Sequence, residues 1–475
     1  MDAKAPVFAA DTEELPLKSL TEISGLIKSG AVSPVEVTEA VLARIARYDG
    51  ALRSFITVTG DHALEAARTA EAEIAAGFWR GPLHGVPIAV KDLCNTTYAP
   101  TSHGMFIHKD FMAGENATVV DRLDTAGAVM VGKLAQTEGA MSGHHPNMPT
   151  PVNPWVSQIW TGASSSGSGV ATAAGFCYGS LGSDTGGSIR FPSAANALTG
   201  VKATWGRVSR AGVWALADSF DHVGPMTRTV ADAAAMLAVI AGHDPRDPTS
   251  LNDPVDDYLA GLGGSIAGLR VGLDEDFVFS GVSEEVSSML QAAIDTLVGL
   301  GARIVPVKMP AMDGMGDYWM QINAAECAVA HRKTFPSRRD EYGPVLTSVI
   351  DMGLALTGVE VAEAMQFRLR LNGGIKRAML DCDVMLVPAM ADPVRDADFW
   401  SKAENADAVA GLIKYTALFD MTGQPTLSLN GGFDTRGAPL GFQLVGHHLD
   451  ETTLFKAGHA FQSATPWHSR HPQLS

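Results

Sequence analysis

Residues 182–190 read Gly-Ser-Asp-Thr-Gly-Gly-Ser-Ile-Arg, and the rest of the chain can be interpreted outward from this stretch. Gly186 and Gly187 lack a Cβ, so the backbone there can turn sharply and approach a ligand closely. Successive N–H groups in such a turn can point into one concavity and bind an anion. Ser188 follows directly, with its hydroxyl at the edge of that concavity. The stretch indicates either a nucleophilic serine beside an oxyanion hole or a Gly/Ser loop without chemistry.

The composition is that of a large folded protein. The chain has 475 residues, of which 46% are hydrophobic and 18% charged, values that argue against disorder. Its net charge of −17 makes binding to a nucleic-acid backbone unexpected as a main role. The four cysteines are widely spaced and form no CxxC motif, so the sequence suggests neither a zinc cluster nor a disulfide scaffold, and the pattern fits a reducing cytosol. The acidic N-terminus has no apolar signal region, and no apolar run reaches the ~18 residues of a membrane span. We therefore expect a cytoplasmic protein.

Helix and strand signals alternate along the chain. Ser19 with Glu22 and Ser33 with Glu36 form capping boxes, which predict helices starting at these two serines. Further helices are expected near 61–76, 117–125, 168–175, 230–241, 284–300 and 450–462, and strands near 86–90, 127–132, 177–182, 271–273, 304–307, 383–388, 426–429 and 441–445. This alternation predicts an α/β fold with a mixed central β-sheet covered by helices on both faces.

The chain reads as one large domain over 17–470, preceded by a loose segment, 1–16. Its motifs concentrate in 84–230. A proline-rich loop at 141–160 and a mainly helical region at 311–380 are expected to shape a pocket, because long loops in compact domains are often binding elements.

Several common cofactor motifs are missing from the sequence. We find no GxxxxGK[ST] phosphate loop, no HExxH, no GxSxG elbow and no strand followed by GxGxxG. No cofactor and no metal are therefore expected.

Lys91 directly follows the apolar run 86–90. A lysine at such a position usually extends its amine to solvent, but a buried functional lysine is the alternative. The run 162–169, Gly-Ala-Ser-Ser-Ser-Gly-Ser-Gly, opens the small-residue helix near 168–175, for which close helix packing is the plainest interpretation.

Together these pieces resemble the amidase signature family, whose pattern is approximately GGSSGGS, then GSDTGGSIR, then G[LV]KPTxGRVS. The chain shows these at 162–169, 182–190 and 200–209. The resemblance extends from about residue 17 to 462, including Gly-Gln-Pro at 423–425, and implies a single large amidase-signature domain. The chain departs from the pattern at Ala163, Ser166 and Ala203, none of which removes a catalytic group.

The resemblance implies a Ser–Ser–Lys triad of Ser188, Ser164 and Lys91. Ser188 would be the nucleophile, Ser164 would follow a cis peptide and relay a proton, and Lys91 would be the final base. Ser165 competes for the relay role, since three serines are consecutive. A lysine is a base only when neutral, and burial lowers its pKa from the reference value of about 10.4.

The resemblance also implies the groups that surround the nucleophile. The oxyanion hole would use the N–H groups of Thr185, Gly186, Gly187 and Ser188, and Ala140 and Met141 would border the scissile bond. Asp184 and Arg190 bracket the turn, so we interpret them as a structural ion pair and not as catalysts.

Three functions are considered, and the altered Lys-Ala-Thr segment at 202–204 and the loop rich in Trp and Met favour the first. The first is a free-standing amidase acting on a small amide, with a carbamate (urethane) or ester as other substrates of the same triad. Apolar side chains in the loop and helical region (Met148, Trp155, Trp160, Trp319 and Met320) would suit a bulky or aromatic group. The second is the glutamine-hydrolysing subunit of a tRNA-dependent amidotransferase, and the third is a non-catalytic binding protein. For the first, the expected partner is the small-molecule substrate, with no nucleic acid and no membrane; a homodimer is left open.

Overall fold

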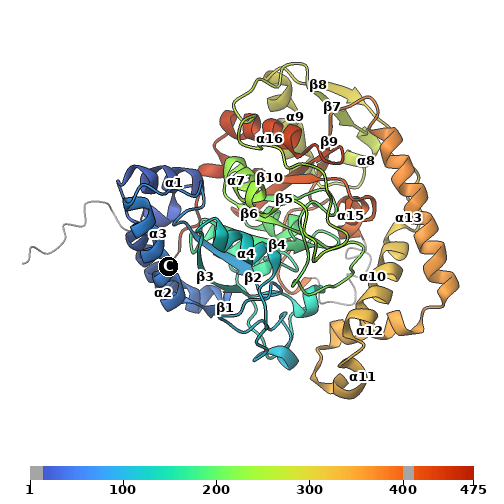
Figure 1. The fold of residues 1–475 in the computed structure, drawn as a ribbon. Coiled ribbons are helices and arrows are strands. Elements are labelled where there is room, and N and C mark those ends of the chain that lie inside the picture. The colour runs from blue at the N-terminus through green and yellow to red at the C-terminus, as the bar shows by residue number, and fades with distance from the viewer. Residues whose placement is uncertain (1–13, 400–410, 475) are drawn as a thin grey trace, which may run out of the picture.

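A mixed β-sheet runs through the centre of the molecule (Figure 1). The computed structural model describes residues 14–399 and 411–474, and within them the sheet has 11 strands in the order β1-β3-β2-β4-β6-β5-β10-β11-β9-β7-β8. The strands are β1 (Phe55–Val58), β2 (Pro87–Lys91), β3 (Val129–Leu134), β4 (Gly179–Asp184), β5 (Thr199–Lys202), β6 (His222–Thr227), β7 (Arg270–Leu273), β8 (Arg303–Pro306), β9 (Val384–Pro388), β10 (Thr426–Phe433) and β11 (Pro439–Gly446). Strands from both ends of the chain share this sheet, as the predicted single α/β domain requires.

Helices cover both faces of the sheet. The α-helices of the first half are α1 (Leu20–Ser29), α2 (Pro34–Leu52), α3 (Gly60–Ala75), α4 (Thr118–Thr125), α5 (Ser166–Ala173), α6 (Arg190–Ala195) and α7 (Val230–Ile240). Those of the second half are α8 (Glu275–Phe279), α9 (Glu284–Gly299), α10 (Met315–His331), α11 (Phe335–Arg338), α12 (Pro344–Ala355), α13 (Gly358–Ala378), α15 (Ala417–Thr422) and α16 (Glu451–Ala464). Neighbouring residues of β4 show the two layers, because Ser180 hydrogen-bonds to α5 whereas Gly179 packs against Met236 of α7.

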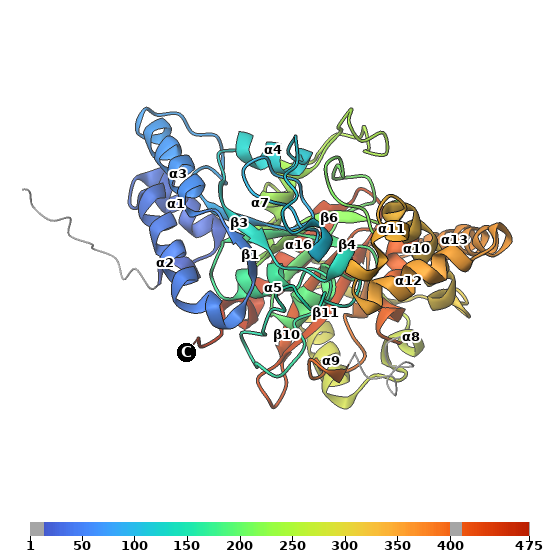
Figure 2. The ribbon, with the colours of Figure 1, turned by 90° about the horizontal axis from the view of Figure 1, so that it is seen from below.

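The two ends of the sheet carry different groups of helices. Figure 2 shows α1, α2 and α3 gathered at one end of the molecule and α10 to α13 at the other. Both capping boxes are present as predicted, at Ser19 before α1 and at Ser33 before α2. In the described residues no single helix is long and apolar enough to cross a membrane; α12 and α13 pass that test only as a pair bent by 101°.

The carboxyl ends of three strands meet at one edge of the sheet. Strand β2 runs parallel to both β3 and β4, so the chain leaves all three in the same direction. Lys91 ends β2 and Asp184 ends β4. Ligand sites in α/β proteins commonly lie at this edge, and here it brings together the motifs found in the sequence.

The expected loose N-terminal segment needs a correction. Residues 1–13 lie outside the described part of the chain. Leu15 and Pro16, however, are buried in a short 3₁₀-helix, η1 (Leu15–Leu17). The hydroxyl of Tyr178 donates a hydrogen bond of 2.8 Å to the carbonyl of Leu15, which fixes this segment to the body of the protein.

Candidate active site

Lys91 and Ser164 are in direct contact in the interior. The side-chain nitrogen of Lys91, Nζ, donates to Ser164 Oγ over 2.6 Å and to Ser183 Oγ over 2.8 Å. Lys91 is completely buried and Ser164 is 1% exposed. The peptide bond between Ala163 and Ser164 is cis, as the resemblance implied. Ser183 was not predicted as a site residue; it lies near the end of β4, the strand that runs parallel to β2.

Burial changes the ionisation of this lysine. Removal from water lowers the pKa of Lys91 to about 7, although the negative charges of Asp184 and Asp221 oppose the shift. An amine with this pKa is substantially neutral near pH 7 and can accept a proton. The geometry therefore supports a buried, functional Lys91 and not a lysine whose amine extends to solvent.

Ser165 occupies a different position from Ser164. Its hydroxyl donates to the carbonyl of Ser183 and accepts from the N–H of the same residue, each over 3.2 Å. The side chain of Ser165 thus links the start of α5 to β4. Of the two serines, Ser164 is the one that hydrogen-bonds to Lys91.

The loop that carries Ser188 is held from within by Asp184. The carboxylate accepts hydrogen bonds from the N–H groups of Gly187 over 2.6 Å and Ile189 over 2.9 Å. One of the four expected oxyanion-hole donors, the N–H of Gly187, is thus hydrogen-bonded to Asp184 in this structure. The N–H groups of Thr185, Gly186 and Ser188 have no hydrogen-bond partner in the part of the chain that the structure describes.

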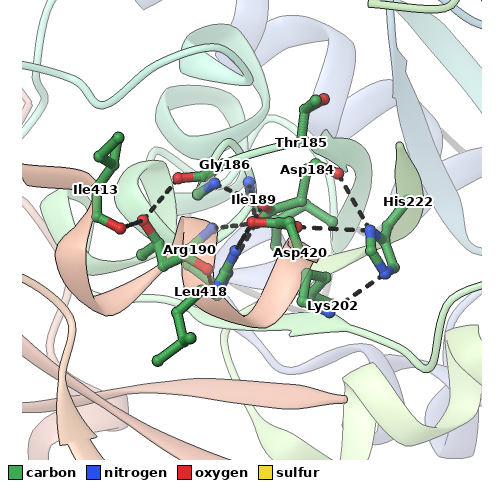
Figure 3. A network of polar contacts seen from close by, with 12 residues as sticks. Asp184, Thr185, Gly186, Ile189, Arg190, Lys202, His222, Ile413, Leu418 and Asp420 are labelled. Carbon is green, nitrogen blue, oxygen red and sulfur yellow. Dashed lines mark hydrogen bonds and ion pairs between the residues drawn. The ribbon is translucent and has the colours of Figure 1, made fainter. Parts of the chain in front are cut away.

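Asp184 belongs to a buried charge cluster behind the loop (Figure 3). Arg190 binds it through Nη2 to Oδ1 over 2.8 Å and Nε to Oδ2 over 3.0 Å, and also reaches Asp420 over 2.5 Å. Burial by itself would raise the pKa of Asp184, but Arg190 holds it well below its usual range. The predicted structural ion pair is confirmed; Asp420, from far along the chain, was not foreseen.

Lys202 and His222 extend the same cluster. Lys202 Nζ lies 3.2 Å from His222 Nε2 and donates to the carbonyl of Gln424 over 2.6 Å. Burial lowers the pKa of Lys202 to about 8 and that of His222 well below its ordinary value. These groups lie behind the loop that carries Ser188 and brace it.

A mainly apolar cavity of about 300 Å³ opens onto Ser188. It is lined by Ala140, Met141, Ser142, Trp160, Ala163, Thr185, Gly186, Ser188, Phe191, Leu216, Gly316, Asp317, Trp319, Met320, Leu412 and Ile413. Asp317 is the only charged residue among these described lining residues, and it is exposed. The cavity can therefore hold an apolar group next to the serine hydroxyl.

The structure brings together most of the predicted pocket residues. Ala140 and Met141 line the cavity, as do Trp160, Trp319 and Met320. Met148 and Trp155 are not among the lining residues, and Trp155 instead donates its indole N–H to the carbonyl of Asn196. Sequence reasoning missed Phe191, Leu216, Leu412 and Ile413. For Phe191 the available signal was its position directly after the 182–190 motif, at the start of α6; nothing local marks the other three.

The cavity has no features of a metal centre. Within residues 14–399 and 411–474, no group of three or more His, Cys, Asp or Glu side chains is arranged to hold a metal ion. The chemistry that this arrangement can perform is nucleophilic attack by Ser188, with proton transfer through neighbouring side chains.

Comparison with known proteins gives consistent matches over nearly the whole chain. The family model described as Amidase matches residues 36–455. AmiD of Mycobacterium tuberculosis, named provisionally as an amidase, is 46% identical over 98% of this chain and 98% of its own length. A glutamyl-tRNA(Gln) amidotransferase subunit of Methylococcus capsulatus is 37% identical over 96% of this chain and 98% of its own. The structure of a bacterial aryl acylamidase superposes with a TM-score of 0.85 at 26% identity, covering 95% of this chain and 97% of that one.

Proposed function

The chain belongs to the amidase signature family, whose enzymes act on carbon–nitrogen bonds, and from this premise we propose that it hydrolyses small-molecule amides bearing a bulky apolar or aromatic group. The apolar cavity of about 300 Å³ next to Ser188 is the observation that carries the proposal. A planar aromatic or branched aliphatic group would be desolvated there, and that burial is favourable.

The proposed reaction proceeds through an acyl-enzyme. Ser188 Oγ attacks the carbonyl carbon, and its proton passes through Ser164 to neutral Lys91. The C–N bond breaks as the amine nitrogen takes up that proton by the reverse route. Water then attacks the ester on Ser188, passes a proton to Lys91 in the same way, and releases the carboxylic acid as Ser188 regains its hydrogen.

The negative oxygen formed in each step needs hydrogen-bond donors. We assign this role to the N–H groups of Thr185, Gly186 and Ser188 and exclude that of Gly187. Donors that are fixed before the reaction stabilise the developing charge without reorganisation. A carbamate or an ester forms the same tetrahedral oxyanion, so both belong among the substrates to be tested.

Glutamine hydrolysis for an amidotransferase is the second candidate, on account of the relatives that are 37% and 38% identical. Free glutamine carries a carboxylate and an ammonium group, and burying a charge without a partner is costly. The described lining residues contain no cation that would pair with the carboxylate. This favours the apolar amide. The contact between Lys91 and Ser164 speaks against a non-catalytic binding protein.

A substrate panel tests the proposal directly. Wild type and Ser188→Ala would be compared on glutamine, phenylacetamide, phenylacetyl 4-nitroanilide, 4-nitrophenyl phenylacetate and an aryl carbamate, with amine, ammonia or phenol release as the readout. We expect the phenylacetyl amide and anilide to be hydrolysed by wild type only. Turnover of glutamine alone, or an active Ser188→Ala protein, would contradict the proposal.

A further inference from the structure

Trp319, on the cavity-facing side of α10, is hydrogen-bonded to the nucleophile loop. Its indole N–H donates to the backbone carbonyl of Thr185 over 3.0 Å. The side chain is almost fully buried, with 5% of Trp319 exposed, and it lines the cavity together with Thr185 and Gly186. One tryptophan therefore contacts both the space for the substrate and the backbone next to the nucleophile.

This hydrogen bond fixes the direction of a backbone donor. Within the described residues the only cis peptide bond is that between Ala163 and Ser164, so the bond from Thr185 to Gly186 is trans. In a planar trans peptide the C=O and the N–H point in opposite directions. By holding the carbonyl of Thr185, Trp319 sets the orientation of the Gly186 N–H, which has no hydrogen-bond partner in the described chain.

The indole ring also packs directly against this peptide. A Cβ added at Gly186 would overlap ring atoms of Trp319, so only glycine allows the approach. The next peptide is held by a different element, since the Thr416 hydroxyl donates to the carbonyl of Gly186 over 2.6 Å. The N–H of that second peptide, on Gly187, points to Asp184. The two peptides are thus oriented separately, and Trp319 controls the one whose N–H is unpaired.

We propose that Trp319 is a positioning residue for the oxyanion hole and aims the Gly186 N–H at the substrate oxygen. The proposal rests on the acyl-enzyme function proposed above. It assigns α10 a role beyond that of a pocket wall, because the helix that contacts the apolar part of the substrate also orients a donor for the reacting carbonyl. An amide that displaces Trp319 would lose rate as well as affinity.

The test is Trp319→Phe, which keeps an aromatic ring and removes the indole N–H. With phenylacetyl 4-nitroanilide we expect kcat to fall roughly tenfold to hundredfold, since a misdirected donor costs somewhat less than a deleted one. KM should change by less than about threefold. Phenylacetaldehyde, which adds to Ser188 and forms the tetrahedral oxygen, should lose affinity by the same factor as kcat. Binding of uncleaved anilide in the Ser188→Ala background should not change.

Two further variants distinguish the loss of the indole N–H from a change in the packing of the cavity wall. Trp319→benzothienylalanine replaces only the N–H by sulfur in a ring of nearly the same shape, so its effect does not depend on repacking; it should reproduce the loss in kcat. Met320→Leu changes the next residue of the same cavity wall and should alter KM while leaving the ratio of aldehyde affinity to anilide affinity as in wild type.

The possible results distinguish the role of Trp319 from the proposed amide hydrolysis. Wild-type kcat and aldehyde affinity in both Trp319 variants, with Ser188→Ala inactive, would overturn the role of Trp319 and leave the proposed function intact. A rise in KM with unchanged kcat would also overturn it, because that is the result expected for a residue that only forms part of the cavity wall. Full activity of Ser188→Ala would instead refute the proposed function.

Discussion

Lys91 changes its charge within the range of ordinary buffers, because burial lowers its pKa to about 7. Only the neutral amine can accept the proton of Ser188, so kcat/KM should rise about tenfold per pH unit below that pKa and level off above it. The measurement is a pH–rate profile from pH 5.5 to 9 with phenylacetyl 4-nitroanilide. Lys91→Arg, which stays charged throughout, should be inactive at every pH. A flat wild-type profile below pH 7 would contradict the role of Lys91.

The neighbouring serines offer a matched pair of substitutions. Ser164→Ala removes one hydrogen-bond partner of Lys91 and should lower kcat by roughly 10⁴-fold or more, the range found for members of a catalytic unit. Ser165→Ala removes two hydrogen bonds to the backbone of Ser183 and should mainly lower the melting temperature. Kinetics and thermal unfolding of both variants decide the matter. If Ser165→Ala were the slower enzyme with unchanged stability, the relay would be assigned to the wrong serine.

The site residues that could be predicted lie in contiguous motifs. Ser188, Ser164 and Lys91 were found because their sequence neighbours identify them, and the pair Asp184 and Arg190 because it brackets a turn. The available donors were only partly predictable. Glycine indicates that the backbone can approach a ligand, but it does not say which N–H groups are already occupied, and Gly187 donates to Asp184.

Among the secondary-structure elements, α12 is attached to the site through one buried carboxylate. Glu138, two residues before Ala140, accepts from the N–H of Gly343 through both oxygens, at 3.0 and 2.9 Å. Gly343 is the residue before α12. Burial raises the pKa of Glu138 to about 7. The helix is thus tied to a segment that borders the cavity.

Two substitutions at Glu138 should have opposite effects. Glu138→Ala leaves the buried Gly343 N–H unpaired and should destabilise the protein by about 1–3 kcal/mol. Glu138→Gln keeps an acceptor and removes the cost of burying charge. Because the native pKa is raised, ionising Glu138 costs stability as pH rises from about 4.3 to 7, so Glu138→Gln should be at least as stable as wild type at pH 8. Melting temperatures and hydrogen exchange in α12 measure both. Equal melting temperatures for the alanine variant and wild type would contradict the attachment.

Helices with a capping box were more predictable than interior strands for a physical reason. Capping boxes at Ser19 and Ser33 are local signals, and both helices start where expected. Strands β1, β5 and β6 were not predicted. Strand β6, His-Val-Gly-Pro-Met-Thr, contains Gly224 and Pro225, residues that usually argue against an interior strand. It is a strand because β4 and β5 pair with it on both sides, and that information is not local.

For the whole molecule, the Arg190 cluster joins the first half of the chain to the second. Asp420→Ala would leave a buried guanidinium with one carboxylate fewer and should destabilise the fold by about 3–5 kcal/mol, with loss of activity as the loop loosens. The control is Arg270→Ala, which breaks the surface pair with Asp383 and should hardly change the melting temperature. Equal losses in the two variants would show that the buried cluster has no special role.

The cavity as a whole could not be read from the sequence. Its walls include Leu412 and Ile413, which lie more than two hundred positions after Ser188 in the chain and carry no motif. A mixed α/β sheet was predictable from the alternation of elements, but the order of its strands was not. Strands β5 and β10 lie side by side although most of the second half of the chain separates them. That pairing, together with the contacts of Thr416 and Asp420 with Gly186 and Arg190, brings the late residues to the loop that carries Ser188.

This connection also has a consequence for the synthesis of the protein, because the partners of Arg190 are translated long after it. Arg190 donates to the Thr416 carbonyl, the Asp420 carboxylate and the Gln443 side chain, which follow it by 226, 230 and 253 positions. At ~5–20 residues per second, the ribosome delivers the last of these on the order of tens of seconds after the serine. The nascent chain therefore carries its nucleophile unbraced for most of that time. We therefore expect amide hydrolysis to begin only when translation is nearly complete, and a chain that ends before Thr416 to be inactive.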